Sequence, residues 1–213
     1  MTKCLICGSE TTNIIDSQIR VTHSHCDNCG FIYKNKEFHL SLDVEHQNYK
    51  MHNNSFESEG YVQIFVNLVN EYIKPLNIKG KILEFGSGPG PVLKELLLRE
   101  GYDVFDFDPF FNINVDYLKY KYQLITSTEV VEHFVDPSKE FKHLSGLLQK
   151  DGYLLLMTRL RTMDTEEFLN WWYRRDLTHI SFYTLETFKE IGKRNGLELV
   201  NTNNVNIIVF KKI

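Results

Sequence analysis

Four cysteines near the start of the sequence are spaced as metal ligands. Cys4 and Cys7 form one C-x2-C pair, and Cys26 and Cys29 form a second pair after eighteen intervening residues. This spacing is typical of a structural zinc site, in which four thiolates surround the ion and leave no position open for a substrate. The alternatives are two disulfides, which a reducing compartment disfavours, or four unrelated thiols; His23 and His25 could also substitute as ligands, although four cysteines already fill the shell. We expect structural Zn²⁺ at these cysteines and a module whose folding depends on the metal.

A second candidate site is the glycine-rich stretch at residues 81–90, K-I-L-E-F-G-S-G-P-G. An apolar run ends at Phe85, three glycines follow at alternating positions, and an apolar pattern with helical spacing begins after Pro91. Strand, tight turn and helix in this order open a doubly wound α/β sheet, and such a turn lets a ligand approach the backbone closely. A dinucleotide-binding turn needs a glycine at the sixth position, where this chain has Pro91, so an NAD-dependent oxidoreductase is disfavoured.

Titratable side chains in later segments are candidates for binding and proton transfer. Asp108 ends an apolar stretch twenty residues after Gly88, and a carboxylate there can accept both hydroxyls of a ribose. A loop-capping role for Asp108 is the alternative, and Asp106 competes for the ribose if the strand register is shifted. His133 and His179 carry imidazoles suited to proton transfer near neutral pH, so both are candidate catalytic bases. A positioning role is the alternative for each.

Two motifs in the chain resemble those of one enzyme family. E-F-G-S-G-P-G at residues 84–90 is similar to the nucleotide-binding loop of class I S-adenosylmethionine-dependent methyltransferases, and T-S-T-E-V-V-E-H at residues 126–133 is similar to their fourth-strand signature. The resemblance covers roughly residues 60–213, and W-x-Y-x-R-D-x-T-H further resembles small bacterial members with an N-terminal cysteine module. It implies an α/β fold with a doubly wound, Rossmann-like sheet of seven strands, the last antiparallel, plus a small zinc ribbon.

The resemblance also implies where the co-substrate S-adenosylmethionine binds. The implied cofactor-binding residues are Glu84, Gly86, Ser87, Gly88, Gly90, Asp108, Thr128, Glu129 and Val130. In this family the segment before the first strand often covers the methionine end of the cofactor, which makes Tyr49, His52 and Asn54 candidates for that role. Solvent exposure of the connector histidines, His39, His46 and His52, is the alternative. Asp116 is a weaker candidate for contact with the adenine, and its neighbours Tyr117 and Leu118 are the alternatives.

The same reading divides the chain into regions. We expect a zinc-ribbon-like module at residues 1–35, a connector at 36–58 and a class I methyltransferase domain at 59–213. Residues 110–121 leave little room for the helix and third strand that the family usually has, so we expect only an abbreviated strand around residues 113–115.

Residues 159–181 are the segment expected to contact the methyl acceptor, because they follow a strand end and carry W-W-Y-R-R-D-L-T-H. Aromatic side chains beside arginines suit a flat or anionic molecule, although a lid packed only against protein is an equal alternative. We expect methyl transfer to an oxygen, nitrogen or carbon of a small molecule, with nucleic acid or protein acceptors left open. A non-catalytic protein that binds S-adenosylmethionine, or that uses its zinc ribbon for interaction, is the alternative.

Composition and charge limit the class of protein to which the chain can belong. The 213 residues are 42% hydrophobic and 24% charged, as in ordinary globular proteins, and the formal net charge of −4 argues against a broad nucleic-acid-binding surface. The sequence shows neither a signal-peptide pattern nor an apolar run near the ~20 residues that span a bilayer. We therefore expect a cytoplasmic protein with no membrane partner.

Overall fold

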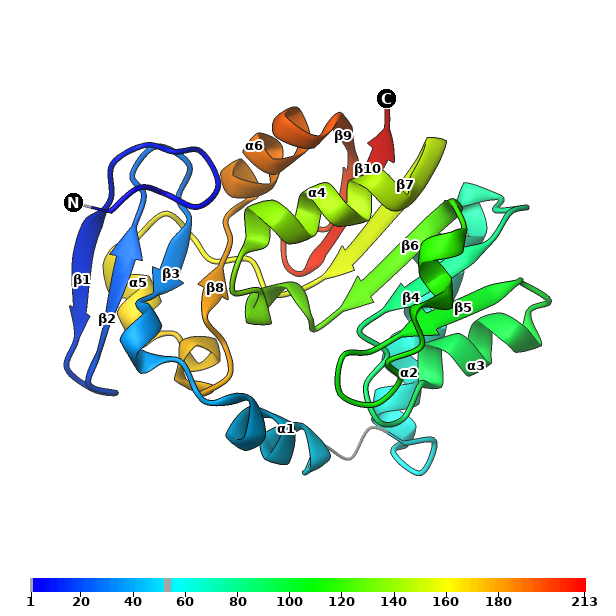
Figure 1. Cartoon of the computed structure of the whole chain (residues 1–213), viewed down its shortest axis with the longest axis horizontal. Coiled ribbons are helices and arrows are strands. Elements are labelled where there is room, and N and C mark those ends of the chain that lie inside the picture. Colours follow the sequence, from blue (N-terminus) through cyan, green and yellow to red (C-terminus); the bar gives the residue numbers. More distant parts are fainter. Residues whose placement is uncertain (1, 52–54) are drawn as a thin grey trace.

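A twisted central sheet, mostly parallel, organises the computed structural model, which describes residues 2–51 and 55–213. In the described part of the chain this sheet has six strands (Figure 1). Their order is β5 (Val104–Phe107), β4 (Ile82–Phe85), β6 (Tyr122–Thr128), β7 (Leu148–Met157), β10 (Ile207–Lys212) and β9 (Leu197–Thr202). The strands β5, β4, β6 and β7 run parallel, so their carboxyl ends meet at one edge, where open α/β sheets bind ligands.

Helices cover both faces of the central sheet. The helices α2 (Glu59–Leu68) and α3 (Val92–Arg99) pack on one face, and α4 (Pro137–Leu147) and α6 (Leu185–Asn195) pack on the other (Figure 1). Successive side chains of β7 alternate between these two cores: Leu154 and Leu156 join the α4–α6 side, whereas Leu155 joins the α2–α3 side. Burial on both faces is what a parallel sheet requires.

Short helices complete the described secondary structure. They are η1 (Lys36–Phe38), η2 (Val69–Ile73, a π-helical turn that continues α2), η3 (Lys74–Leu76), η4 (Val115–Lys119), η5 (Val131–His133), α5 (Thr165–Asn170) and η6 (Trp172–Arg175). Within residues 2–51 and 55–213, none of the helices has the length and apolar character needed to cross a bilayer.

The predicted antiparallel last strand is confirmed, but the predicted number of strands is not. β10 pairs antiparallel with β7, with Ile208 opposite Leu156, and it also pairs antiparallel with β9. The central sheet has six strands in the described residues rather than seven, because the region expected to hold the third strand forms η4 instead.

Local polar contacts explain why no strand forms around residues 113–115. The Asp108 carboxylate accepts the backbone N–H groups of Phe110 and Phe111 at 2.8 and 3.0 Å, and the Asn114 side chain accepts the N–H of Asp116 at 2.9 Å. These side-chain bonds offer the backbone a turn in place of a ladder. Ile113 is 72% exposed, so apolar burial does not favour a strand there either.

A second, antiparallel sheet stands beside the central one (Figure 1). Its strands are β1 (Thr12–Asp16), β2 (Val21–His25), β3 (Ile32–Lys34) and β8 (Ser181–Phe182). The first three come from the predicted zinc-ribbon-like module, but β8 comes from late in the chain, with Phe182 opposite Ile32. The proposed division into three regions stays a prediction, and the two larger regions share this sheet.

The described part of the predicted connector contains the short helix η1 and the α-helix α1 (Leu42–Lys50), which lies along the lower side of the view between the small sheet and α2 (Figure 1). The aromatic side chains of its inner face contact the end of β5: His46 stacks on Phe110, with ring centroids 5.2 Å apart, and Tyr49 lies 5.4 Å from the same ring. The helix therefore lies against the edge of the sheet at which the strands end.

Candidate functional site

A large cavity lies at the carboxyl ends of β4, β5 and β6, with a volume of about 1170 Å³. It brings together every predicted cofactor-binding residue and both predicted histidines. Those lining residues are Glu84, Gly86, Ser87, Gly88, Gly90, Asp108, Thr128, Glu129, Val130, His133 and His179. Segments distant in the sequence therefore meet in one place, as the predicted topology requires.

The glycine loop approaches its neighbours too closely for side chains. Gly86 has φ of +85°, and a Cβ atom there would lie 2.3 Å from Cγ2 of Val130. Its N–H donates to the carbonyl of Phe107 at 2.7 Å, which ties the loop to the end of β5. Only glycine fits both the backbone conformation and the space, so the loop presents bare backbone to the cavity.

Asp108 fixes the loop from the neighbouring strand. One carboxylate oxygen accepts the Gly88 N–H at 2.8 Å, and the other accepts the two N–H groups after Pro109. Each carboxylate oxygen can accept more than one bond, so capacity remains for a ligand. The alternative residue, Asp106, lies outside the described cavity lining and pairs with Lys94 at 2.7 Å. The geometry favours Asp108 over Asp106 for the predicted ribose contact.

Glu84 places an unpaired acid in the cavity wall. The residue is 3% exposed, and its Oε2 lacks a hydrogen-bond partner among the described residues. Burial, with the nearby charge of Asp106, raises the pKa of Glu84 to about 8. A buried acid of this kind is stabilised by a ligand that donates a hydrogen bond or carries positive charge.

The two predicted histidines lie beside each other in the cavity lining, with ring centroids 5.0 Å apart. Nδ1 of His133 lies 3.0 Å from the Thr178 carbonyl oxygen, and Nδ1 of His179 lies 2.8 Å from that of Tyr173. A carbonyl only accepts, so each Nδ1 carries the proton and each neutral ring keeps a lone pair on Nε2. Burial lowers the pKa of both imidazoles, that of His179 to about 4.

Two acids beside the histidines share one tyrosine. The Tyr173 hydroxyl contacts Oε1 of Glu132 and lies 3.1 Å from Oε2 of Glu129. Burial, reinforced by the charge of Glu132, raises the pKa of Glu129 to about 8, and burial also raises the pKa of Glu132. A phenol has one hydrogen, so both contacts are satisfied when one of the acids is protonated.

Sequence reasoning did not assign roles to Tyr173 and Glu132. The available signals were the E-H pair containing Glu132 and the aromatic run containing Tyr173. Glu129 carries a further signal that only coordinates reveal: its φ is +54°, an uncommon conformation for a side chain of this size. Backbone strain of this kind often marks a functional site.

The connector contributes Tyr49 to the cavity, and the contact of Tyr49 with the cofactor stays a prediction. The Tyr49 side chain lines the cavity, donates to Glu45 at 2.6 Å, and lies edge-on to His133, with ring centroids 5.3 Å apart. His52 and Asn54 lie outside the described residues. Of the candidates for adenine contact, Tyr117 lines the cavity.

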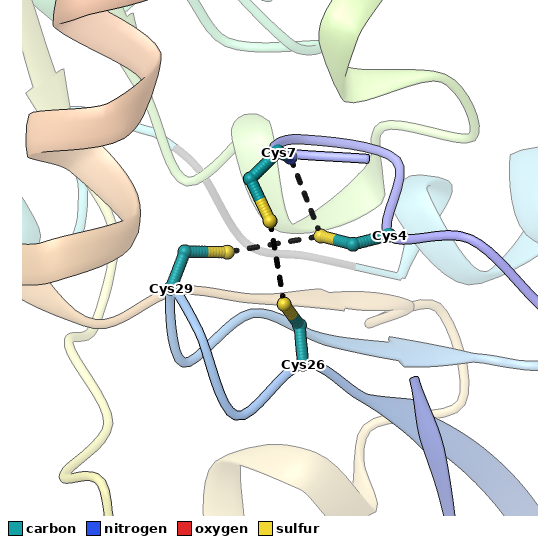
Figure 2. A group of neighbouring side chains, drawn as sticks. All are labelled: Cys4, Cys7, Cys26 and Cys29. Carbon is teal, nitrogen blue, oxygen red and sulfur yellow. Dashed lines mark hydrogen bonds between the residues drawn. The ribbon is translucent and has the colours of Figure 1, made fainter. Parts of the chain in front are cut away.

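The four cysteines form a second candidate site, a metal centre (Figure 2). Their sulfur atoms lie within 4.8 Å of one another, with 3.7 Å between Cys4 and Cys29 and 3.4 Å between Cys7 and Cys26. A tetrahedral zinc ion with bonds of about 2.3 Å separates its sulfurs by about 3.8 Å. The four thiols are free, so the disulfide alternative is not what the structure contains. The cluster has the geometry to hold a metal ion.

The second cysteine pair also packs against residues from later in the chain, near the start of α6. Gly30, which follows Cys29, has φ of +74°, and a Cβ there would lie 2.5 Å from Sδ of Met163 and 2.7 Å from Oγ1 of Thr184. The carbonyl of Cys29 accepts the hydroxyls of Thr184 and Thr187 at 3.1 and 2.7 Å. The metal centre and the start of α6 therefore form one packed unit.

Buried charges connect the small sheet to the wall of the cavity that carries Tyr173 and His179. Arg174 is fully buried and pairs with Asp16 of β1 at 3.0 Å. Lys34 of β3 is 2% exposed, and its Nζ donates to the Leu177 carbonyl at 3.0 Å. Residues 173–179 therefore take their position from the cysteine-bearing part of the chain.

Comparisons with known proteins agree with this geometry. A family model described as a methyltransferase domain matches residues 59–202. Magnesium protoporphyrin IX methyltransferase from Synechocystis PCC 6803, solved with bound SAH, is 16% identical, with a TM-score of 0.57 over 84% of this chain and 98% of that chain. CalO1, a methyltransferase in calicheamicin biosynthesis solved with SAH, is 13% identical, with a TM-score of 0.55 over 81% of this chain and 61% of that chain.

A comparison with curated proteins finds no match. At such low identities the solved structures show a shared fold, whereas the family model covers most of the chain. The predicted zinc-ribbon-like module lies before the matched residues, so the match leaves it untested. The protein belongs to the family of methyltransferase domains.

Proposed function

We propose that the protein transfers the methyl group of S-adenosylmethionine to a small-molecule acceptor bound in the same cavity. The observation that carries the proposal is the composition of that cavity. One part, the donor end, is bare glycine backbone with Asp108, and a neighbouring part, the acceptor end, is a buried group of histidines and acids. A donor site and an acceptor site therefore adjoin within one cavity, which is what direct transfer between two bound molecules requires.

The donor end suits a molecule that has hydroxyls and a positive charge. Asp108 can accept ribose hydroxyls, the Gly86–Gly88 backbone leaves room for close approach, and Glu84 holds a buried oxygen without a partner among the described residues. S-adenosylmethionine carries an ammonium group and a sulfonium, and both are favoured beside buried carboxylates.

The acceptor end combines polar side chains with the positive charge of Arg159, which lines the cavity and lies over the Trp172 ring. In the reaction, a nucleophilic atom of the acceptor bonds to the methyl carbon, the carbon–sulfur bond breaks, and its electron pair stays on sulfur as S-adenosylhomocysteine forms. The proton of the acceptor leaves to a neighbouring group or to water. The free Nε2 lone pairs of His133 and His179 face this end and serve the acceptor.

The first test is calorimetric titration of the metal-replete protein with S-adenosylmethionine, repeated on Asp108→Ala. We expect micromolar binding to the wild type and at least a tenfold loss in the variant, because the variant removes the ribose contact and three loop hydrogen bonds. Asp103→Ala is the matched control, since Asp103 lies at the other end of β5 and pairs with Lys81 at 2.6 Å. Absence of binding to the wild type would contradict the proposal.

Turnover separates catalysis from the alternative of a non-catalytic binder. Incubation with S-adenosylmethionine and a panel of small hydroxyl and amine acceptors should release S-adenosylhomocysteine with at least one of them. A protein that only senses S-adenosylmethionine, or that uses the cysteine module for interaction, would bind the donor and release no product with any acceptor, protein and nucleic acid included.

We further propose that the four cysteines hold one structural Zn²⁺. The support is the sulfur geometry, together with two N–H groups, of Ile6 and Cys7, that point at Cys4 Sγ from 3.4 and 3.5 Å. Four thiolates fill a tetrahedral shell, so the metal holds the small sheet and leaves the methyl transfer to the cavity. Metal analysis should give one zinc per chain, and a purified protein without zinc that keeps the β1–β3 sheet would contradict the assignment.

A further inference from the structure

A second group of metal-ligating side chains lies at the acceptor end of the cavity, away from the cysteines. Glu132, His133 and His179 place one ligand atom each within 4.8 Å of one another. Glu132 and His133 come from η5 and His179 from the segment held by the small sheet. We propose that these three residues bind a divalent transition-metal ion, an inference that rests on the proposed function because the ion would serve the same acceptor.

The histidines are already oriented as metal ligands. Each donates its Nδ1 proton to a backbone carbonyl, and this is the outer contact that metal-ligating histidines commonly make. The contact leaves each Nε2 with its lone pair. Asp176 is the nearest acid to one of these nitrogens, with Oδ2 at 3.8 Å from His179 Nε2, beyond hydrogen-bond distance.

The carboxylate gives an independent indication of a missing partner. Glu132 is fully buried, and its Oε2 has no hydrogen-bond partner among the described residues, whereas Oε1 contacts the Tyr173 hydroxyl. The ion pairs in the described part of the chain include neither Glu132 nor Glu129. The side-chain neighbour of Glu132 is the carboxyl of Glu129, a second acid without an ion pair. Two buried acids side by side, neither of them paired with a cation of the described residues, are suited to a bound cation.

The ligand set identifies the class of ion and the class of acceptor. Two imidazoles and one carboxylate favour zinc, iron(II), cobalt or nickel over magnesium and calcium, which prefer oxygen ligands. Three protein ligands leave positions open, and both histidines line the cavity, so those positions face the acceptor. A metal ion there binds and acidifies a hydroxyl, whose proton passes to water before the oxygen attacks the methyl carbon. The acceptor is therefore a molecule with a hydroxyl at the methylated position.

The test is a cobalt(II) titration of protein whose cysteine site has first been filled with zinc, followed by calorimetry and by the visible spectrum of the bound cobalt. We expect one further equivalent with micromolar affinity and the weak visible bands of nitrogen and oxygen ligation. The strong sulfur-to-cobalt absorption near the ultraviolet should be absent. Its presence would mean exchange at the cysteines and would count against the second site.

Three single variants, Glu132→Gln, His133→Ala and His179→Ala, should each weaken this second equivalent at least tenfold. His143→Ala is the matched control, because His143 also lines the cavity but lies outside the cluster, and it should bind cobalt as the wild type does. S-adenosylmethionine binding by each variant reports that the donor end is still folded.

The outcomes separate the two proposals. Donor binding without a second equivalent of metal in the wild type overturns the metal site and leaves the methyltransferase proposal standing; Glu132 and Glu129 then share a proton. Equal cobalt affinity in the wild type and in folded variants also overturns it. Absence of donor binding contradicts the proposed function itself.

Discussion

The two ends of the cavity are built in different ways. The donor end comes mostly from residues 84–108, a short stretch whose strand, turn and helix form one local unit, and backbone groups do most of the shaping. Val130, which is also predicted to bind the cofactor, packs against Gly86. The acceptor end comes from side chains of residues 129–133 and 173–179, which meet only because the small sheet holds the second segment. The donor end is thus specified mostly locally, whereas the acceptor end depends on packing across nearly the whole chain.

Removal of the metal should have the largest effect, and it should fall on the acceptor end. Cys26→Ser takes away a thiolate ligand, so we expect loss of bound zinc and of protection from hydrogen exchange in β1–β3 and in residues 173–181. Residues 86–90 should stay protected and should still bind S-adenosylmethionine. Chelation of the wild type should reproduce this pattern and zinc should reverse it; uniform loss of protection would show that the two ends are not independent.

Asp16→Ala should also destabilise the acceptor end, because it removes one partner of a buried ion pair. It leaves the Arg174 guanidinium buried without its counter-ion, which costs about 3 kcal/mol in the free energy of unfolding. Chemical denaturation measures that loss. The exposed pair of Glu186 and Lys189 provides the control, since Glu186→Ala should cost less than about 0.5 kcal/mol. Equal losses in the two variants would contradict the importance of the buried pair.

Gly86→Ala should damage the donor end alone. The new methyl group lies against Val130, and an alanine at φ of +85° adds about 1 kcal/mol of backbone strain. We expect at least a tenfold loss of S-adenosylmethionine affinity with zinc content unchanged. Val130→Ala in the same chain relieves the contact and should restore part of the affinity. Failure of this second change to help would place the defect in the backbone conformation rather than in the contact.

Gly146→Ala should have the smallest effect and the opposite sign. Gly146 lies in α4, and a Cβ atom there meets nothing within 4 Å. Replacement of an exposed helical glycine by alanine stabilises by about 0.5–1 kcal/mol, which thermal unfolding detects as a higher midpoint. Zinc content and donor affinity should both stay at wild-type values, and a lower midpoint would contradict the open environment of this residue.

The difference between the ends also explains what the sequence could predict. The glycine loop, Asp108 and the cysteine pairs were recognisable because their residue types and spacings lie within short stretches. β8 and the position of residues 173–179 could not be recognised in the sequence. The pairing of Phe182 with Ile32 and the burial of Arg174 against Asp16 join segments far apart in the chain and leave no local pattern. The third strand was expected by analogy with a family. In this chain the local hydrogen bonds of Asp108 favour a turn in place of that strand.

The pairing of β3 with β8 has a consequence for synthesis of the protein. A ribosome completes both cysteine pairs early, so the metal can be captured while most of the central sheet has yet to be made. The outer edge of β3 then stays open, with unpaired backbone groups that can recruit another chain, until β8 emerges. Assembly of the acceptor end is therefore a late event in the life of the nascent chain, and the interval before it is the period of greatest risk of aggregation.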